Sequence, residues 1–336
     1  VRLVSRKQST LYRAGMDSSK YSFKSEDIVS GLPGYVTPLS VQFSPDGQLM
    51  TYLFPDASGQ RKVFTVNLSD EAKLLEGSYT LFDTNASTEG LSLQEQLRRE
   101  RMRLFTQGIS SYEWSKAATA GISLQRLIVP LNGKILLYER RLHTTTTTSS
   151  DEEYTSVCRV VYDGSAGEAV DPHLSPDGKK LAFVIADDLY AMVIPPDMED
   201  SPATSAKSSS NADVTPPPPP PPTSPTRLTW NGAKEGVTCG LADFLAQEEM
   251  DRYRGFWWSP NSAQIVYAEA DETVVPAYEI RHLGKADPTH VETHRYPFAG
   301  KVNPFVTLAV VTLNLPEPVF TQADSSSSSS GGGGVS

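Results

Sequence analysis

The sequence predicts an all-β protein, because one pattern of a tight turn followed by a short strand occurs three times. The turns read Ser-Pro-Asp-Gly at 44–47 and 175–178, and Ser-Pro-Asn at 259–261. Proline followed by Asp or Asn is ordinary β-turn chemistry, and the short β-branched and aromatic runs after each turn are typical of strands. Repeated short antiparallel sheets indicate the blades of a partial β-propeller, in which each blade buries its faces against its neighbours.

The strands expected after these turns can be placed along the chain. The first strand of each unit is predicted at 49–53, 181–184 and 265–267. A second strand follows in two of the units, at 62–68 and 188–193. A fourth, degenerate copy combines residues 112–115 with 134–138. We therefore predict a partial propeller over residues 32–315, preceded by an N-terminal extension over 1–31.

Low-complexity segments interrupt this pattern. Residues 144–151 are a Thr/Ser tract, and residues 201–226 contain seven consecutive prolines at 216–222. Neither composition can bury a core, so we expect both to be loop insertions, the proline run being extended. The proline run is either a tolerated loop expansion or a ligand for an SH3- or WW-type module. The Ser/Gly-rich residues 316–336 are expected to form a disordered tail.

One arginine-rich helix is predicted between the first two units. Ser92 and Glu95 form a capping box, which indicates that the helix begins there. Four arginines crowd its C-terminal half, where the helix dipole favours cations: Arg98, Arg99, Arg101 and Arg103. They form either a solvated basic face or a group with a binding role.

A second, short helix is predicted to end in two adjacent acids. Its apolar stripe begins at Leu241, and the i+7 and i+8 positions of that stripe are Glu248 and Glu249. Successive residues of a helix are about 100° apart, whereas those of a strand point to opposite faces, so a helix lets both carboxylates converge on one target. Converging carboxylates need a cation. The simpler alternative is a solvated helix end in which Glu248 pairs with Arg252.

The segment from 247 to 260, QEEMDRYRGFWWSP, resembles a hallmark of the dipeptidyl peptidase IV family of serine peptidases, particularly its intracellular and bacterial members. The resemblance continues through 270–275 and 296–304, and a weaker match precedes it at 91–114. It implies an N-terminal propeller region of that family.

The resemblance also implies roles for particular residues. Glu248 and Glu249 would hold the free α-ammonium group of a peptide, and Arg101 or Arg103 would bind a substrate carbonyl oxygen. An α-amino group has a pKa near 8 and is mostly protonated at neutral pH, so two carboxylates suit it. Such an anchor, two residues from the scissile bond, makes a peptidase release dipeptides.

The nucleophile of such an enzyme is not found in this sequence. The Gly-x-Ser-x-Gly elbow that presents a catalytic serine does not occur in the 336 residues. Family members place their Ser-Asp-His triad in an α/β-hydrolase domain that follows the propeller. We therefore expect a substrate-gating segment of a serine-type dipeptidyl peptidase that removes X-Pro or X-Ala dipeptides, either a fragment or a truncated product, inactive by itself. The alternative is a non-catalytic propeller that binds other proteins.

The composition limits which classes of partner and which cellular compartment we expect for this protein. A formal charge of −10 argues against nucleic acid, and no run approaches the roughly 20 apolar residues of a membrane span. Cys158 and Cys239 are too few for a disulfide framework, which favours a cytoplasmic protein; a missing N-terminal segment would instead allow secretion or membrane anchoring. Histidine spacing suggests no metal, and no cofactor is expected. The expected partners are peptide N-termini, a C-terminal hydrolase domain and, by resemblance, a second copy in a homodimer.

Overall fold

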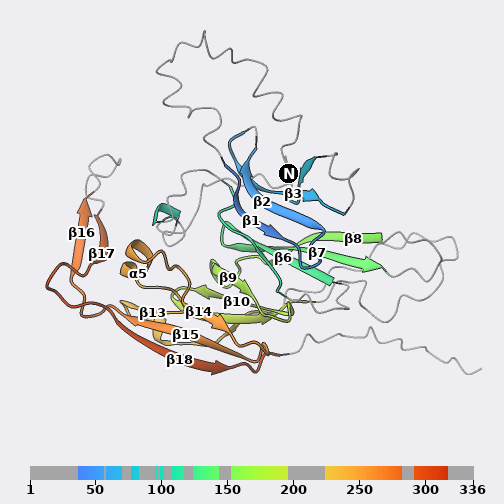
Figure 1. The fold of residues 1–336 in the computed structure, drawn as a ribbon. Helices are drawn as coiled ribbons and strands as arrows, with labels where there is room; N and C mark the ends of the chain where they lie inside the picture. The colour runs from blue at the N-terminus through green and yellow to red at the C-terminus, as the bar shows by residue number, and fades with distance from the viewer. Residues whose placement is uncertain are drawn as a thin grey trace, which may run out of the picture.

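The structure is a computed structural model that describes residues 37–56, 58–69, 77–82, 96, 99–101, 108–116, 124–143, 153–195, 224–281 and 291–316. Within these ranges antiparallel strands dominate and form four sheets of four strands and one separate hairpin. The sheets follow the order of the sequence and lie one beside the next, from the blue sheet to the orange and red one in Figure 1. The arrangement confirms the all-β class and the partial β-propeller.

The first three sheets are meanders, in which each strand pairs with its neighbours in sequence. The first contains β1 (Leu39–Phe43), β2 (Leu49–Pro55), β3 (Arg61–Asn67) and β4 (Ser78–Thr80). The second contains β5 (Glu113–Trp114), β6 (Leu124–Leu131), β7 (Lys134–His143) and β8 (Glu153–Tyr162). The third contains β9 (Val170–Leu174), β10 (Lys180–Ile185), β11 (Asp188–Val193) and β12 (Thr226–Arg227). The strands predicted in the first and third units correspond to β2, β3, β10 and β11.

The fourth sheet differs because its first strand is divided. After a 3-10 turn, η2 (Asn231–Ala233), the strands β13 (Val237–Cys239) and β14 (Phe256–Trp258) pair with the two ends of β15 (Gln264–Asp271). The full length of β15 also pairs with β18 (Phe305–Thr312). The segment between β13 and β14 carries α5 (Phe244–Glu249). The hairpin of β16 (Ala277–Arg281) and β17 (Val291–Arg295) projects away from the sheets in Figure 1.

The three predicted turns share one hydrogen-bond pattern. In each, the serine Oγ accepts a hydrogen bond of 2.9 Å from the backbone N–H five residues later, for Ser44, Ser175 and Ser259 alike. The first two turns also need a left-handed residue, which Gly47 and Gly178 supply with φ of +73° and +69°. The local sequence of the turn therefore sets where each following strand begins.

Hydrophobic clusters fill the spaces between consecutive sheets. Because side chains of a strand alternate between faces, β6 contributes to two clusters. Leu127 and Val129 pack toward the first sheet, whereas Ile128 packs toward the third. Phe183 of β10 likewise faces the second sheet, while its neighbour Val184 packs with residues of the fourth. The two middle sheets are thus covered on both faces, as blades of a propeller are.

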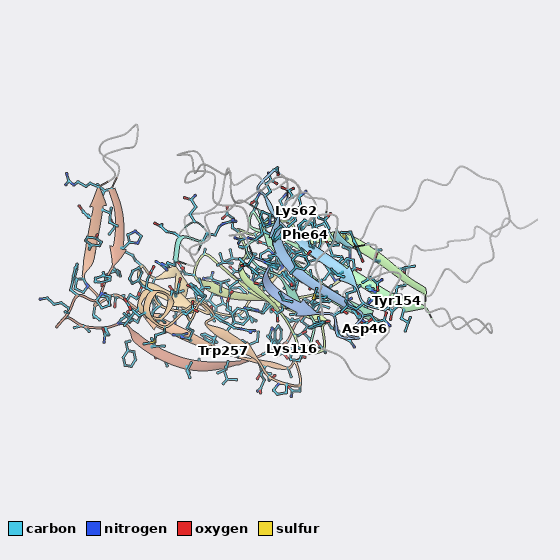
Figure 2. All side chains as sticks on the ribbon, turned by 45° about the horizontal axis from the view of Figure 1, so that its top comes forward. Asp46, Lys62, Phe64, Lys116, Tyr154 and Trp257 are labelled. Carbon is cyan, nitrogen blue, oxygen red and sulfur yellow. The ribbon has the colours of Figure 1, made fainter. Side chains whose placement is uncertain are left out.

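A polar contact joins the turn of the first sheet to the second sheet. Arg140 of β7 donates to Asp46 Oδ2 at 2.8 Å, and its guanidinium lies 3.5 Å from the ring centre of Tyr154. The Tyr154 hydroxyl donates to the same oxygen of Asp46 at 3.2 Å. Figure 2 shows Asp46 and Tyr154 close together at one end of the sheets. The Ser-Pro-Asp-Gly turn therefore also serves as an attachment point for the next blade.

A buried ion triad joins the second and third sheets. Glu139 accepts from Arg126 and from Arg159, both at 2.8 Å, and its side chain is only 5% exposed. The two arginines also donate to backbone carbonyls of the third sheet region, Arg126 to Gly178 at 2.7 Å and Arg159 to Pro195 at 2.5 Å. Glu139 thus fixes two cations that hold the neighbouring blade.

Several predicted segments lie outside the described residues. They are the extension 1–31, the tract 144–151, most of the insertion 201–226 and all but the first residue of the tail 316–336. Thr226, the last residue assigned to the proline-rich insertion, belongs to β12. The insertion therefore leads directly into the last strand of the third sheet.

A histidine connects the second, third and fourth sheets. His173 of β9 contacts Glu113 of β5 through Nδ1 at 2.5 Å and Asp171 through Nε2 at 3.1 Å. Its ring also meets Phe256 of β14 edge to face, with the ring centres 5.3 Å apart. Burial by itself would lower the pKa of His173, but the two carboxylates outweigh it and hold that pKa above its ordinary value. The imidazolium is therefore a bridge between two acids.

The contribution of His173 to stability should depend on pH. A group whose pKa is raised in the folded state stabilises fully below its unfolded pKa, about 6.5, and this contribution fades as pH rises through the folded value. We expect His173→Gln to lower the thermal midpoint near pH 6 and to have a smaller effect at pH 9. Melting curves of both proteins from pH 6 to 9 measure this. If the difference in thermal midpoint between the two proteins stays the same from pH 6 to pH 9, His173 acts through packing alone.

Candidate functional site

The candidate site lies in the segment that divides the first strand of the fourth sheet. An antiparallel bridge between Leu241 and Arg254 closes the base of this segment. A Cβ added to Gly255 would lie 2.4 Å from the carbonyl carbon of Leu241 and 2.5 Å from that of Gly240, so this close approach requires glycine. The loop therefore leaves the sheet and returns to it at almost the same point.

The helix that carries the two acids is shorter than predicted. α5 begins at Phe244 rather than Leu241, because Leu241 is still paired with Arg254 in the bridge. Asp243 caps it: its Oδ1 accepts from the N–H of Ala246 at 3.0 Å. Glu248 and Glu249 are the last two residues of the helix, so the prediction of adjacent acids at a helix end is confirmed.

The ion pair expected for a solvated helix end is replaced by another. Arg252 contacts Asp243 at 3.4 Å and donates to the carbonyl of Arg254 at 3.1 Å. Glu248 instead approaches Arg101, with 3.7 Å between Oε1 and Nε. Arg252 thus closes the loop, and Glu248 faces a cation from another part of the chain.

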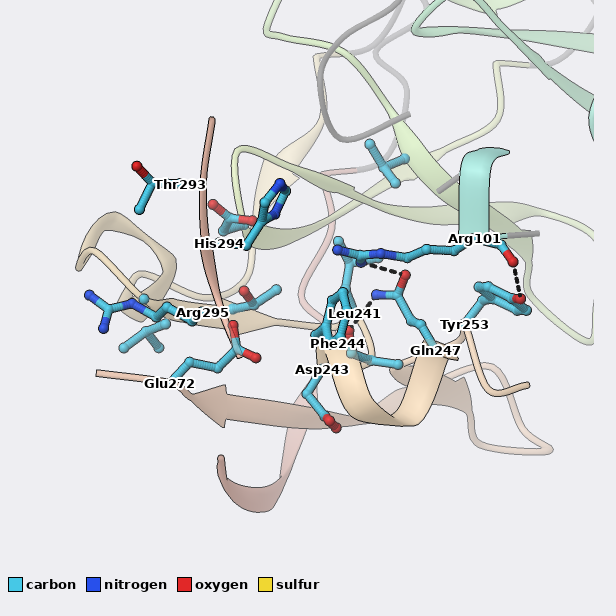
Figure 3. Close-up of a pocket in the computed structure, with 16 residues that line it drawn as sticks. Arg101, Leu241, Asp243, Phe244, Gln247, Tyr253, Glu272, Thr293, His294 and Arg295 are labelled. Atoms are coloured by element: carbon cyan, nitrogen blue, oxygen red, sulfur yellow. Dashed lines mark hydrogen bonds between the residues drawn. The ribbon is translucent and has the colours of Figure 1, made fainter. Parts of the chain in front are cut away.

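Arg101 is the arginine that the structure brings to Glu248. Its Nη1 donates to Gln247 Oε1 at 2.9 Å, and its guanidinium lies 4.7 Å from the ring centre of Phe244. The hydroxyl of Tyr253 donates to the Arg101 carbonyl at 3.3 Å, and Figure 3 shows Arg101 extended across α5. Arg101 is helical, as are residues 96, 99 and 100, while the remaining arginines of the predicted helix, including Arg103, lie outside the described residues.

Arg101 and the two acids of α5 differ in charge and in exposure to solvent. Burial lowers the pKa of the Arg101 guanidinium, and the carboxylates of Glu248 and Glu272 oppose the change. An arginine pKa starts so high that the group stays charged. Glu248 and Glu249 are exposed and within reach of a ligand from solvent. The site therefore combines a half-buried, fixed cation with two accessible anions.

A cavity of about 290 Å³ lies beside α5. Its charged and polar walls include Arg101, Asp243, Gln247, Glu272 and Arg295, and Phe244 supplies an aromatic wall. Glu248 and Glu249 are not among the residues that line it. The cavity is thus a separate space that shares Arg101 and Gln247 with the acidic pair.

Glu272 is the residue of this region to which sequence reasoning gave no role. It follows β15, its Oε1 is buried, and no hydrogen-bond partner for that atom occurs among the described residues. Burial raises the pKa of the Glu272 carboxyl, while the Phe244 N–H and Arg101 act in the opposite direction. The sequence signal was an acid directly after a mostly apolar strand, which was noted only as part of the family resemblance.

No group of three or more His, Cys, Asp and Glu side chains suited to a metal ion occurs in the described part of the chain. None of the helices in that part has the length and apolarity needed to cross a membrane.

Comparison with known proteins shows which family part of this chain matches. The sequence profile of the dipeptidyl peptidase IV (DPP IV) N-terminal region matches residues 221–331, which include α5 and the whole fourth sheet. Over these residues the chain matches a dipeptidyl peptidase IV N-terminal region. Dipeptidyl peptidase 4 of Bos taurus is 36% identical over 95 residues, which cover 27% of this chain and 12% of the bovine protein. Dipeptidyl peptidase 8 of Homo sapiens is 25% identical over 244 residues, covering 68% of this chain and 23% of the human protein.

The chain therefore matches less than a quarter of the length of these two relatives. A solved structure of Porphyromonas gingivalis dipeptidyl peptidase 4 aligns with 88% of this chain and 35% of its own, with a TM-score of 0.47 and 19% identity. That likeness is too weak to bear on the site. The likeness to this family rests on the sequence matches, and the blades are seen in the sheets themselves.

Proposed function

We propose that this chain is the substrate-gating propeller segment of a serine-type dipeptidyl peptidase. In this proposal Glu248 and Glu249 bind the α-ammonium group of a peptide N-terminus, and Arg101 binds the carbonyl oxygen of the first peptide bond. The chemistry that breaks the bond belongs to a hydrolase domain outside these 336 residues. A homodimeric, cytoplasmic enzyme is the corresponding proposal for the whole protein.

The observation that carries the proposal is the contact between Arg101 and the segment that contains the acids. Arg101 and Gln247 are 146 residues apart in sequence, yet they are joined by a hydrogen bond of 2.9 Å, and Glu248 lies beside the same guanidinium. A peptide N-terminus carries a cation and, a few atoms away, a carbonyl acceptor. An accessible carboxylate beside a fixed arginine, with a second acid next to it in sequence, complements that cation and that acceptor.

The fixed position of Arg101 supports a role in recognition. Its backbone carbonyl is held by Tyr253, and its side chain packs on Phe244 and bonds Gln247. All three partners belong to the segment between β13 and β14, so the arginine and the acids form one preorganised unit. Preorganised groups lose less entropy when a ligand binds.

Binding of a dipeptide with a blocked amine tests the proposal. We expect Ala-Pro to bind the chain at least about tenfold more tightly than N-acetyl-Ala-Pro, because acetylation removes the charge that pairs with the carboxylates. NMR titration of the purified chain with both peptides measures the two dissociation constants. Equal affinities would contradict the amine anchor and favour a propeller that binds proteins without catalysis.

A further inference from the structure

Helix α5 depends on neighbouring elements for its position. It contains six residues, of which Ala246 alone is buried. A helix this short is not stable by itself, so contacts with other elements decide where it lies. Its first residue, Phe244, meets a ring from another part of the chain: the ring centres of Phe244 and Tyr296 are 5.5 Å apart, edge to face. The helix that carries the two acids is therefore supported from the side of the β16–β17 hairpin.

Phe244 is also the ring on which Arg101 lies. The Arg101 guanidinium is 4.7 Å from the centre of that ring, and Figure 3 shows Arg101 reaching across α5 to it. A cation is attracted to the face of an aromatic ring, so its position depends on how the ring is oriented. The edge-to-face contact with Tyr296, at an angle of 76° between the rings, restrains that orientation. One ring thus contacts both the arginine and its support.

The backbone of Tyr296 is anchored at the base of the hairpin. Its N–H donates to the carbonyl of Pro276 at 3.1 Å, so the residue after β17 is bonded to the residue before β16. The preceding residue, Arg295, donates through its side chain to the carbonyl of Val275 at 3.0 Å, and Val275 is buried. The ring of Tyr296 therefore contacts α5 from a fixed backbone.

Two further rings continue the contact into the hairpin. The centre of the Phe298 ring is 5.0 Å from that of Tyr296 and 5.9 Å from that of Tyr278 on β16, both edge to face. Tyr296, Phe298 and Tyr278 are 37%, 43% and 43% exposed, so burial alone does not account for their arrangement. Edge-to-face pairs contribute beyond the area that they bury, by orienting one ring against the next. The four rings form a row that leads from β16 to the start of α5.

We propose that Tyr296 is a positioning residue for substrate recognition. By orienting the Phe244 ring, it holds the Arg101 guanidinium beside Gln247 and Glu248. The inference deepens the proposed function and rests on it, because that function assigns Arg101 to the carbonyl oxygen of the peptide and Glu248 to its amine. Tyr296 acts through Phe244 and does not need to touch the peptide.

Two substitutions separate the ring of Tyr296 from the rest of the side chain. Tyr296→Leu removes the ring, whereas Tyr296→Phe keeps it. We expect Tyr296→Leu to weaken binding of Ala-Pro by about three- to tenfold, and Tyr296→Phe to keep the affinity of the unmodified chain. NMR titration measures the dissociation constants. Tyr79→Leu, at an exposed tyrosine of β4 in the first sheet, is the matched control and should leave the dissociation constant unchanged.

The NMR signal of the Arg101 Nε–H group reports the position of the arginine without any ligand. The ring current of Phe244 shields protons above its face, so this signal should lie upfield of that of a solvated arginine. Tyr296→Leu should move it toward the solvated value, and Tyr296→Phe should not. Phe298→Leu, one ring further along the row, should move it in the same direction by less. If Tyr296→Leu does not fold, Phe298→Leu decides, and an unmoved signal in that variant overturns the proposal.

The outcomes separate this inference from the function on which it rests. If the unmodified chain prefers Ala-Pro to N-acetyl-Ala-Pro but Tyr296→Leu changes neither the Arg101 signal nor the affinity, the amine anchor stands and the role of Tyr296 is wrong. A moved Arg101 signal with unchanged affinity, or an equal loss of affinity in Tyr296→Phe, also overturns that role. If acetylation has no effect on binding to the unmodified chain, the proposed function fails, and the role of Tyr296 in recognition fails with it.

Discussion

Glu248→Gln and Glu249→Gln should each weaken binding of a dipeptide with a free amine by about ten- to a hundredfold. Each substitution keeps the size of the side chain but removes the charge from the proposed hydrogen bond to the ammonium group, and charged hydrogen bonds are worth about 1.5–3 kcal/mol. Both side chains are exposed at the end of α5, so the fold should not depend on them. NMR titration with Ala-Pro measures the change.

Combining the substitution with a peptide whose amine is blocked shows whether these acids contact the amine. N-acetyl-Ala-Pro has lost the same contact, so Glu248→Gln should change its affinity little. Glu279→Gln provides the control for loss of one surface charge, since Glu279 is also exposed and lies on the separate hairpin. If the effects of acetylation and of Glu248→Gln on the dissociation constant simply multiply, Glu248 does not contact the ammonium group. The acidic pair would then be a structural helix end.

Glu139→Gln should destabilise the protein by about 3–5 kcal/mol. The substitution leaves Arg126 and Arg159 without their carboxylate, and Arg126 is 8% exposed as a residue. Removing one member of a buried ion pair leaves the other charge buried without a partner. This lowers the free energy of unfolding by far more than a surface ion pair contributes to it. Because Arg159 is more exposed than Arg126, most of the loss should come from Arg126. Urea unfolding followed by tryptophan fluorescence gives the difference in the free energy of unfolding.

A second variant shows whether the loss of stability in Glu139→Gln comes from an unpaired buried charge or from lost packing. Replacing Glu139 and Arg126 together, by Leu and Met, removes both buried charges and should recover much of the stability lost in Glu139→Gln. Glu168→Gln, at an exposed position between the second and third sheets, should change the free energy of unfolding by less than about 0.5 kcal/mol. A loss below about 1 kcal/mol in Glu139→Gln would mean that water or another group compensates the arginines.

The parts of the fold that the sequence predicted are those set by local chemistry. Ser44, Ser175 and Ser259 form their turn hydrogen bonds within five residues, so the turns and the strands after them follow from short-range pattern alone. β6 was not predicted as a strand, although residues on either side of it were assigned to the same unit. Its buried run from Gln125 to Val129 lacks the alternation of apolar and polar residues that is typical of a strand with one solvent-exposed face.

The pairing of β15 with β18 could not be predicted because the two strands are distant in sequence. The hairpin of β16 and β17 separates β15 from β18, and the pairing of the two is visible only in the folded chain. The start of α5 was misplaced for a related reason: Leu241 fits a helical stripe but is held by Arg254 in a bridge. Tertiary pairing overrides local periodicity at that residue.

The candidate site was predictable only in part. The adjacent acids, and Arg101 as one of two arginines, came from a motif and its resemblance. The contact between Arg101 and Gln247 depends on how distant segments of the chain meet, and no local pattern contains it. Glu272 was missed as a site residue because its significance lies in burial without a partner, which is a property of its surroundings and not of its spacing.

The division of the first strand of the fourth sheet gives the loop that carries α5 a stem. Since the bridge from Leu241 to Arg254 closes behind it, residues can be gained, lost or exchanged beyond that stem without shifting the register of β15 against β14. Natural variation can therefore change the residues around α5 while the blade beneath it stays the same. For protein engineering, the stem marks the two cut points between which a foreign recognition loop can be grafted.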